Sequence, residues 1–125
     1  MLDKAKLRDN IDCIMEEVAI LHTLDHPNIV KYYETYNDQK FIYLVMEYIN
    51  GMPLFDKITA QANQTFTERQ AAHYMKALFQ AINHCHAMNI VHRDIKPDNI
   101  VLGHTEEAIL IDFGTAAFSD EINYT

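Results

Sequence analysis

The sequence predicts an α+β fold, because two stretches with helical periodicity flank a stretch of strand character and two short strands follow. Apolar residues recur every three or four positions through 11–24 and again through 67–89, which is the spacing of one helix face. Between them, 29–36 and 40–47 are rich in β-branched and aromatic residues. Helices and strands are thus both expected within one chain.

The first half of the chain is expected to form a helix and a hairpin. Asp9 or Asn10 caps the start of the helix, and Pro27 forces His26 out of the helical region and ends it. Asn37 and Asp38 supply turn chemistry between the two strands. The apolar face of the helix is expected to consist of Ile11, Ile14, Met15, Val18, Leu21 and Leu24.

The second half begins with a short helix around 54–60. A long helix over 67–89 follows, and Thr67 with Gln70 forms a capping box at its start. Strands are expected at 100–102 and 108–111, with 103–107 as the turn, and nothing after Ile111 has the pattern of a packed element. The apolar face of the long helix is expected to consist of Ala71, Tyr74, Met75, Leu78, Ala81, Ile82, Cys85 and Met88.

The composition indicates an ordinary globular protein, with 49% apolar and 22% charged residues. A net charge of -8 argues against a nucleic-acid surface, which needs clustered Lys and Arg. The longest apolar run, 41–46, is far shorter than the ~20 residues that cross a bilayer. Two cysteines without CxxC spacing fit a reducing compartment. We therefore expect a soluble cytoplasmic protein that binds neither nucleic acid nor membrane.

Charged residues gather in two segments, each beside a short apolar strand. Asp112-Phe113-Gly114 begins thirteen residues after Asn99. The other segment reads His92-Arg93-Asp94-Ile95-Lys96-Pro97-Asp98-Asn99. Together they resemble the catalytic loop and the metal-binding DFG motif of eukaryotic protein kinases.

The resemblance implies a two-lobed protein-kinase-like fold, present here in part. Residues 1–46 would be the end of the small lobe, 47–53 the hinge, and 54–125 the start of the large lobe. The implied activity is transfer of the γ-phosphate of ATP to serine or threonine of a protein substrate, with Mg²⁺. Lys96, two residues after Asp94, is the pattern of serine/threonine kinases.

The resemblance also assigns catalytic roles. Asp94 would accept or orient the proton of the substrate hydroxyl, and Lys96 would neutralise the transferring phosphate. Asn99 and Asp112 would hold Mg²⁺, a hard ion suited to oxygen ligands. Arg93 would pair with a group in the segment after the DFG motif.

A nucleotide pocket is implied by the segments resembling the hinge and its surroundings. Met46 would be the gatekeeper beside the adenine, and main-chain groups of Glu47 and Ile49 would bond its edge. Val101 would lie under the base. A stack that supports the site would consist of Leu21, Tyr32, His92 and Phe113.

Glu17 would pair with the phosphate-anchoring lysine of the family. Glu16 is the neighbouring alternative, although it points about 100° away around the helix. That lysine and the family's glycine-rich loop lie outside these 125 residues, with Lys4 and Lys6 expected at the surface instead. The isolated chain is therefore expected to be inactive.

Within the family, 24–29 and 54–58 are most similar to the calcium/calmodulin-dependent and calcium-dependent protein kinases. A calcium-sensing domain elsewhere in the full-length chain would accord with that resemblance. Pro53 departs from it, since this group often has a ribose-contacting glutamate there. Thr115 departs as well, where a larger apolar residue is common, and hints at threonine acceptors.

Two alternatives stay open. The chain would be a pseudokinase or a truncated binding fragment if the upstream lysine is missing from the full-length protein. A small-molecule phosphotransferase with a kinase-like core is the other, although those families typically lack the pattern of Arg93, Lys96 and 113–114.

Two further clusters are interpreted as structural. His84, Cys85 and His86 are successive helical residues that diverge by about 100°, so they are expected to pack rather than bind a metal. Ser119, Tyr124 and Thr125 are candidate phosphorylation sites of an activation segment, and equally candidates for ordinary loop residues.

Overall fold

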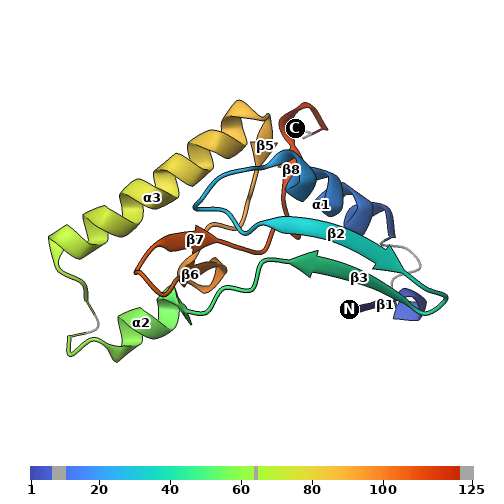
Figure 1. Cartoon of the computed structure of the whole chain (residues 1–125). Helices are drawn as coiled ribbons and strands as arrows, with labels where there is room; N and C mark the ends of the chain where they lie inside the picture. The colour runs from blue at the N-terminus through green and yellow to red at the C-terminus, as the bar shows by residue number, and fades with distance from the viewer. Residues whose placement is uncertain (7–10, 64, 122–125) are drawn as a thin grey trace.

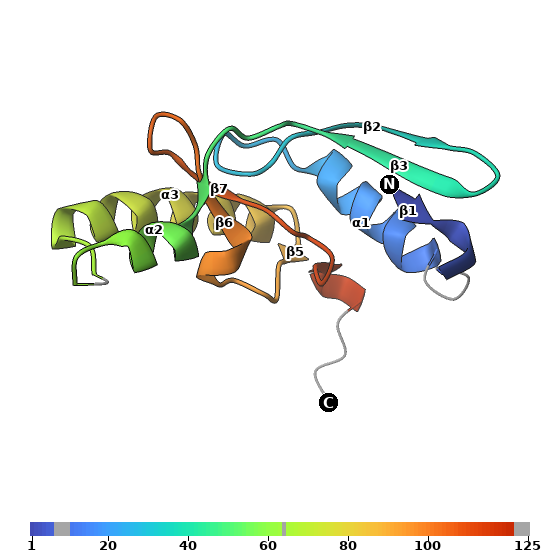
Figure 2. The ribbon, with the colours of Figure 1, turned by 90° about the horizontal axis from the view of Figure 1, so that it is seen from below.

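The computed structural model describes residues 1–6, 11–63 and 65–121 and has the α+β fold that the sequence predicts (Figure 1). In one half of the molecule, an antiparallel sheet in the order β1-β3-β2 lies against helix α1 (Figure 2). The elements of this half are β1 (Leu2–Asp3), the 3₁₀ turn η1 (Lys4–Lys6), α1 (Ile11–Thr23), β2 (Tyr32–Asn37) and β3 (Phe41–Met46).

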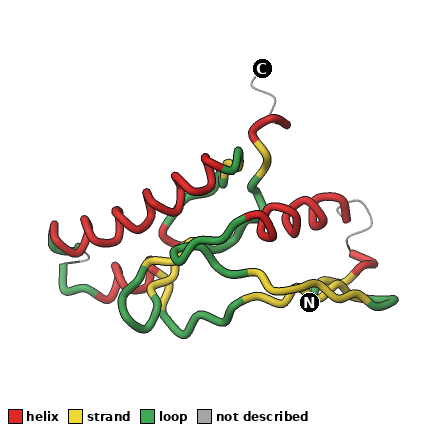
Figure 3. Tube along the Cα trace, turned by 45° about the horizontal axis from the view of Figure 1, so that its top comes forward, coloured by secondary structure: helices red, strands yellow, loops and turns green. Residues whose placement is uncertain are grey.

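The other half contains the two remaining α-helices and the short strands, as Figure 3 shows. One sheet has the order β4-β6-β7, and β5 pairs with β8 in a second. The elements are β4 (Met52–Pro53), α2 (Leu54–Ala60), α3 (Glu68–Ala87), β5 (Ile90–Val91), η2 (Pro97–Asn99), β6 (Ile100–Leu102), β7 (Ala108–Leu110), β8 (Ala117–Phe118) and η3 (Ser119–Glu121).

The predicted hairpin turn is confirmed. The Asp38 carboxylate accepts hydrogen bonds from the main-chain N–H groups of Lys40 and Phe41, both at 2.7 Å. The strand prediction was wrong for Ile29 and Val30, because this segment pairs with β7 through a parallel bridge between Ile29 and Leu110.

Helix α1 forms where the periodicity predicts, but its buried face is rotated. Ile14, Leu21 and Leu24 are buried as expected, whereas Ile11 and Met15 are 37% and 52% exposed. Ile20, outside the predicted face, is fully buried. The helix contacts both β2 and β8, and the second contact is not visible in the sequence. The predicted caps, residues 9 and 10, lie outside the described residues.

The capping box of α3 is confirmed. The Thr67 hydroxyl accepts a hydrogen bond from the Gln70 N–H at 3.2 Å, and the Gln70 side chain accepts one from the Thr67 N–H at 3.1 Å. The helix packs on β5 and β7. Met75 and Met88, at the margin of the predicted face, are 42% and 41% exposed. The buried side of the helix consists of Tyr74, Leu78, Ala81 and Cys85.

A packed element follows Ile111, although the sequence has no pattern that indicates it. Phe113, Ala116 and Ala117 are buried, and β8 pairs with β5. Strands of two residues carry no periodicity, so β1, β4, β5 and β8 arise from tertiary pairing alone.

The two halves are joined by hydrogen bonds between the loop after α1 and strand β7. The Val30 N–H donates to the Leu110 carbonyl at 3.0 Å, and the Leu110 N–H donates to the Asn28 carbonyl at 2.8 Å. The Asn28 side chain donates to the Ala108 carbonyl at 2.9 Å. These bonds fix α1 relative to the strand that leads to Asp112. Among the helices of the described residues, none has the length and apolar character of a membrane span.

Candidate active site

The loop 92–99 connects β5 to β6 and is anchored by a buried histidine. The His92 ring bonds to the Ile111 carbonyl at 3.0 Å and accepts a hydrogen bond from the Asp94 N–H at 3.1 Å. It also packs edge-on against Phe113, with ring centroids 4.8 Å apart. His92 thus ties the loop to the strand before the DFG motif, as the resemblance implies.

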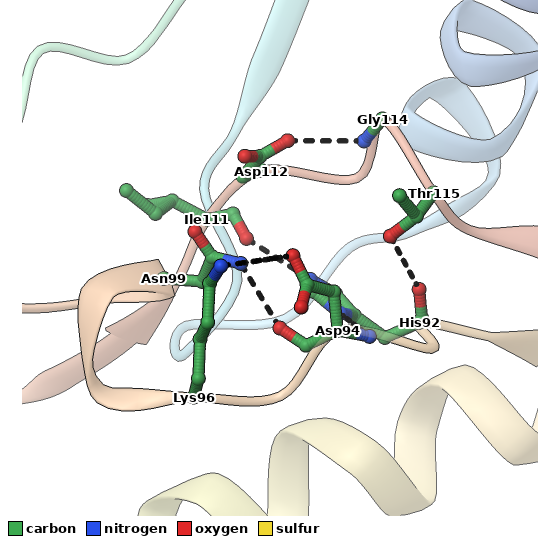
Figure 4. A network of polar contacts seen from close by, with 8 residues as sticks. All are labelled: His92, Asp94, Lys96, Asn99, Ile111, Asp112, Gly114 and Thr115. Carbon is green, nitrogen blue, oxygen red and sulfur yellow. Dashed lines mark hydrogen bonds and ion pairs between the residues drawn. The ribbon is translucent and has the colours of Figure 1, made fainter.

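The side chains of Asp94, Lys96 and Asn99, all from this loop, lie close together (Figure 4). The buried Asn99 amide donates to the Asp94 main-chain carbonyl at 2.9 Å and to its carboxylate Oδ2 at 3.0 Å. The ammonium of Lys96 lies 3.6 Å from the same Oδ2. The carboxylate is therefore fixed by one oxygen, and its other oxygen is not engaged by these groups.

Asp112 follows β7 in the left-handed region of backbone conformation, with φ of 56°. Its Oδ1 accepts a hydrogen bond from the Gly114 N–H at 3.2 Å. Arg93 also has positive φ, 71°. A non-glycine residue in this region is uncommon and costs on the order of 1 kcal/mol or more, and such residues concentrate at functional sites.

The segment after the DFG motif is joined to the catalytic loop. The Arg93 guanidinium donates from Nε to the Thr115 carbonyl at 2.6 Å, and the Thr115 hydroxyl donates to the His92 carbonyl at 3.3 Å. The structure thus places the predicted partner of Arg93 at the main chain of Thr115.

A pocket of about 310 Å³ lies between the halves and contains every residue expected around the nucleotide. The predicted catalytic residues Asp94, Lys96 and Asn99 are not part of its wall. They are connected to it by the Ile111 N–H, which donates to the Asn99 main-chain carbonyl at 2.9 Å. The predicted lining residues are Glu17, Met46, Glu47, Ile49, Val101 and Asp112, and Leu21 and Phe113 join them from the expected stack.

Sequence reasoning missed three residues of this wall: Val30, Tyr48 and Ile111. Tyr48 lies between two predicted hinge residues and Ile111 directly precedes Asp112, so proximity to the motifs was an available signal. Val30 enters the pocket through the pairing with β7, which leaves no mark in the sequence.

Two carboxylates face each other across the pocket. A Cβ placed on Gly114 would lie 3.2 Å from Asp112 Oδ1 and 4.0 Å from Glu17 Oε2, so both groups converge there. Burial, and then the charge of Asp112, raise the pKa of Glu17. Glu17 lines the pocket, whereas Glu16 does not.

The comparisons with known proteins agree with this arrangement. A family model described as the protein kinase domain matches residues 1–124. Calcium-dependent protein kinase 3 of Plasmodium yoelii yoelii is 42% identical over an alignment of 127 positions, which covers 99% of this chain and 23% of that protein. The serine/threonine-protein kinase DCLK3 of Mus musculus is 42% identical over 122 residues, 94% of this chain and 15% of the relative.

A third relative, calcium/calmodulin-dependent protein kinase type 1 of Macrobrachium nipponense, is 33% identical over 123 residues, 96% of this chain and 35% of the relative. The chain thus spans at most 35% of the length of these three relatives. The match covers almost all of the chain and includes both motifs. The chain belongs to the protein kinase domain family, and its relatives include calcium-dependent and calcium/calmodulin-dependent protein kinases.

Proposed function

We propose that the full-length protein is a serine/threonine kinase that uses ATP and Mg²⁺, and that this chain supplies its catalytic base, metal ligands and hinge. The observation that carries the proposal is the position of the Asp94 carboxylate, which Asn99 and Lys96 hold through one oxygen. The pocket beside it is lined by Asp112. The relatives are named as serine/threonine or calcium-dependent protein kinases, which supports a protein substrate.

The oxygen atoms around Asn99 and Asp112 fit Mg²⁺. The side-chain nitrogen of Asn99 donates to the main-chain carbonyl and to Oδ2 of Asp94. The side-chain oxygen of Asn99, Oδ1, is therefore the atom that would bind a cation. Asp112 uses Oδ1 for Gly114 and keeps Oδ2. In the described part of the chain, no group of three His, Cys, Asp or Glu side chains could hold a metal. Mg²⁺ needs no such cage, since it binds through one or two protein ligands, waters and phosphates.

The pocket fits a planar base. Met46, Val101 and Ile49 give it an apolar wall, and its volume is at the lower end of the usual range for ligand sites, roughly 300–1,000 Å³. The Glu47 N–H donates to the Lys31 carbonyl at 2.7 Å. The Glu47 carbonyl and the main chain of Ile49 therefore remain as hydrogen-bonding groups for a base edge.

Asp94 is the proposed base. Asn99 and Lys96 hold its Oδ2, so the hydroxyl proton of the substrate is accepted, or the hydroxyl oriented, by Oδ1. The Lys96 ammonium, which is half exposed, stabilises negative charge on the transferring group. ATP supplies the phosphoryl group, and Mg²⁺ supplies positive charge at the phosphate oxygens.

The proposal is tested with Asp94→Asn in the full-length protein, in a phosphorylation assay with protein acceptors. Loss of the base is expected to lower the rate by about 10²–10⁴-fold. Asp56→Asn, the same exchange at an exposed position on α2, is the matched control and should keep wild-type activity. An Asp94→Asn rate equal to that of the control would refute the role of Asp94.

The 125-residue chain alone is expected to have little or no activity. Its sequence contains no glycine-rich loop, and among the residues that the structure describes no lysine forms an ion pair with Glu17. Loss of one electrostatic stabiliser commonly costs ~10²–10³-fold in rate. Normal turnover by the purified chain would contradict this expectation.

A further inference from the structure

The loop that follows α1 is held to α3 by a histidine. His84, near the end of α3, accepts a hydrogen bond at Nε2 from the main-chain N–H of Asp25, at 3.2 Å. Its ring packs against the ring of His26 in the loop, with centroids 5.3 Å apart and planes inclined by 34°. His26 in turn accepts a hydrogen bond at Nδ1 from the Asn28 N–H, at 3.0 Å.

Both hydrogen bonds require a neutral ring. A ring nitrogen accepts a main-chain N–H only when it carries no proton, so the structure implies the Nδ1–H tautomer for His84 and the Nε2–H tautomer for His26. Protonation of either accepting nitrogen would turn an acceptor into a donor that faces another donor. Two protonated rings at this separation would also repel each other.

The charges around the pair act in both directions. Burial and then His84 lower the pKa of His26, while Asp25 opposes them by raising it. Lys31 and Glu47 line a pocket of about 420 Å³ together with Asp25 and His26. On α1, His22 packs against Tyr32. The exposed His86 lies in the last turn of α3 together with His84.

His26 adds its own pH effect, whose sign follows from its lowered pKa. A lowered pKa means that the folded state disfavours the charged ring. The stability that His26 contributes is therefore present above its ordinary pKa of 6.5 and is lost as the pH falls below it.

This loop joins α1, which carries Glu17, to β7 and α3. Helix α1 ends at Thr23, six residues after Glu17, which corresponds to about 9 Å along the helix axis. On its other side the loop is bonded to β7 through Asn28 and Val30. The Asp25–His84 bond and the His26–His84 ring contact therefore link the end of this helix to α3.

We propose that His84 is a positioning residue for Glu17, and that it holds the α1 exit loop only while its ring is neutral. Acidification then releases the loop from α3 and loosens the alignment of Glu17 with Asp112. The effect on catalysis rests on the function proposed above, whereas the effect on the loop does not.

The experiment compares the pH profile of phosphotransfer for the full-length wild type and His84→Gln, from about pH 7.5 to about pH 5.5. Glutamine offers an amide oxygen to the Asp25 N–H but does not titrate. We expect the wild type to lose about two- to tenfold in rate relative to His84→Gln over this range, the equivalent of one net hydrogen bond. His86→Gln, the same exchange at an exposed position on the same helix, should follow the wild type.

A second measurement on the wild type needs neither variant nor activity. NMR is expected to show the amide signal of Asp25 shifting together with the titration of the His84 ring, and that of Asn28 together with the titration of the His26 ring. Profiles of wild type and His84→Gln that coincide would overturn the positioning role. An Asp25 amide signal that does not change as the His84 ring titrates would overturn the proposal altogether, whatever the protein catalyses.

Discussion

At the scale of single residues, Glu17 and Asp112 show that the arrangement of the site lowers the stability of the chain. Both carboxylates converge near Gly114, and burial and Asp112 raise the pKa of Glu17. A raised pKa means that the charged form is disfavoured in the folded state. Such a cost is common where a site is prepared for a ligand or a cation.

We therefore predict that Glu17→Gln stabilises the 125-residue chain at neutral pH. The wild type loses stability as the pH rises past 4.5, the ordinary pKa of a glutamate side chain. The Glu17→Gln variant does not, because glutamine carries no charge. Thermal unfolding followed by circular dichroism at several pH values measures the difference. It should vanish below about pH 4, and a less stable variant at neutral pH would contradict the prediction.

Tyr74 provides a second test at this scale. Its buried hydroxyl donates to Glu106 at 2.5 Å, and burial followed by this bond raises the pKa of Tyr74 to about 12. Tyr74→Phe should lower the free energy of unfolding by about 1 kcal/mol. Tyr48→Phe, at a side chain that is 87% exposed, is the control.

The pH dependence of stability should also differ between the wild type and Tyr74→Phe. A raised pKa implies that wild-type stability is complete below pH 10 and falls as the pH rises toward 12. Tyr74→Phe should lack that part of the alkaline loss. Equal denaturation curves for Tyr74→Phe and Tyr48→Phe would show that the hydroxyl contributes nothing.

At the scale of elements, the capping box at the start of α3 has a measurable effect. Thr67→Ala removes the acceptor for the Gln70 N–H and should destabilise the chain by about 1 kcal/mol, as loss of an N-cap typically does. Thr65→Ala, at an exposed position two residues earlier, is the matched control. Chemical denaturation compares the two, and a Thr67→Ala midpoint no lower than that of Thr65→Ala would refute the contribution.

The sequence predicted the elements that carry a local signal and missed those that depend on distant partners. Both long helices, the hairpin and strands β6 and β7 have periodicity or turn chemistry of their own. The short strand β8 exists because β5 pairs with it, and Val30 reaches the pocket because β7 pairs with its loop.

The site was predictable for a different reason. Asp94, Asn99 and Asp112 belong to motifs in which residue type and spacing are set by the chemistry, so a sequence match places them without knowledge of packing. Which face of α1 is buried could not be predicted, because α1 also packs against β8 and no local sequence pattern encodes that contact.

At the scale of the whole molecule, the chain exposes apolar surface on α3. Phe79 is 62% exposed and Met75, one helical turn earlier, 42%. We predict that the 125-residue chain binds a hydrophobic dye or aggregates, and that Phe79→Gln reduces the dye signal. A wild-type chain that stays monomeric and binds no dye would contradict this.

The most direct test of the central claim is transfer of labelled γ-phosphate from ATP to a protein acceptor by the full-length protein. The wild type should place the label on serine or threonine and only with Mg²⁺ present. Asp112→Asn should lower the rate at least ~10²-fold, because Asp112 is a proposed metal ligand. Absence of transfer by the wild type under these conditions, or transfer that Asp112→Asn leaves unchanged, would contradict the proposed kinase site.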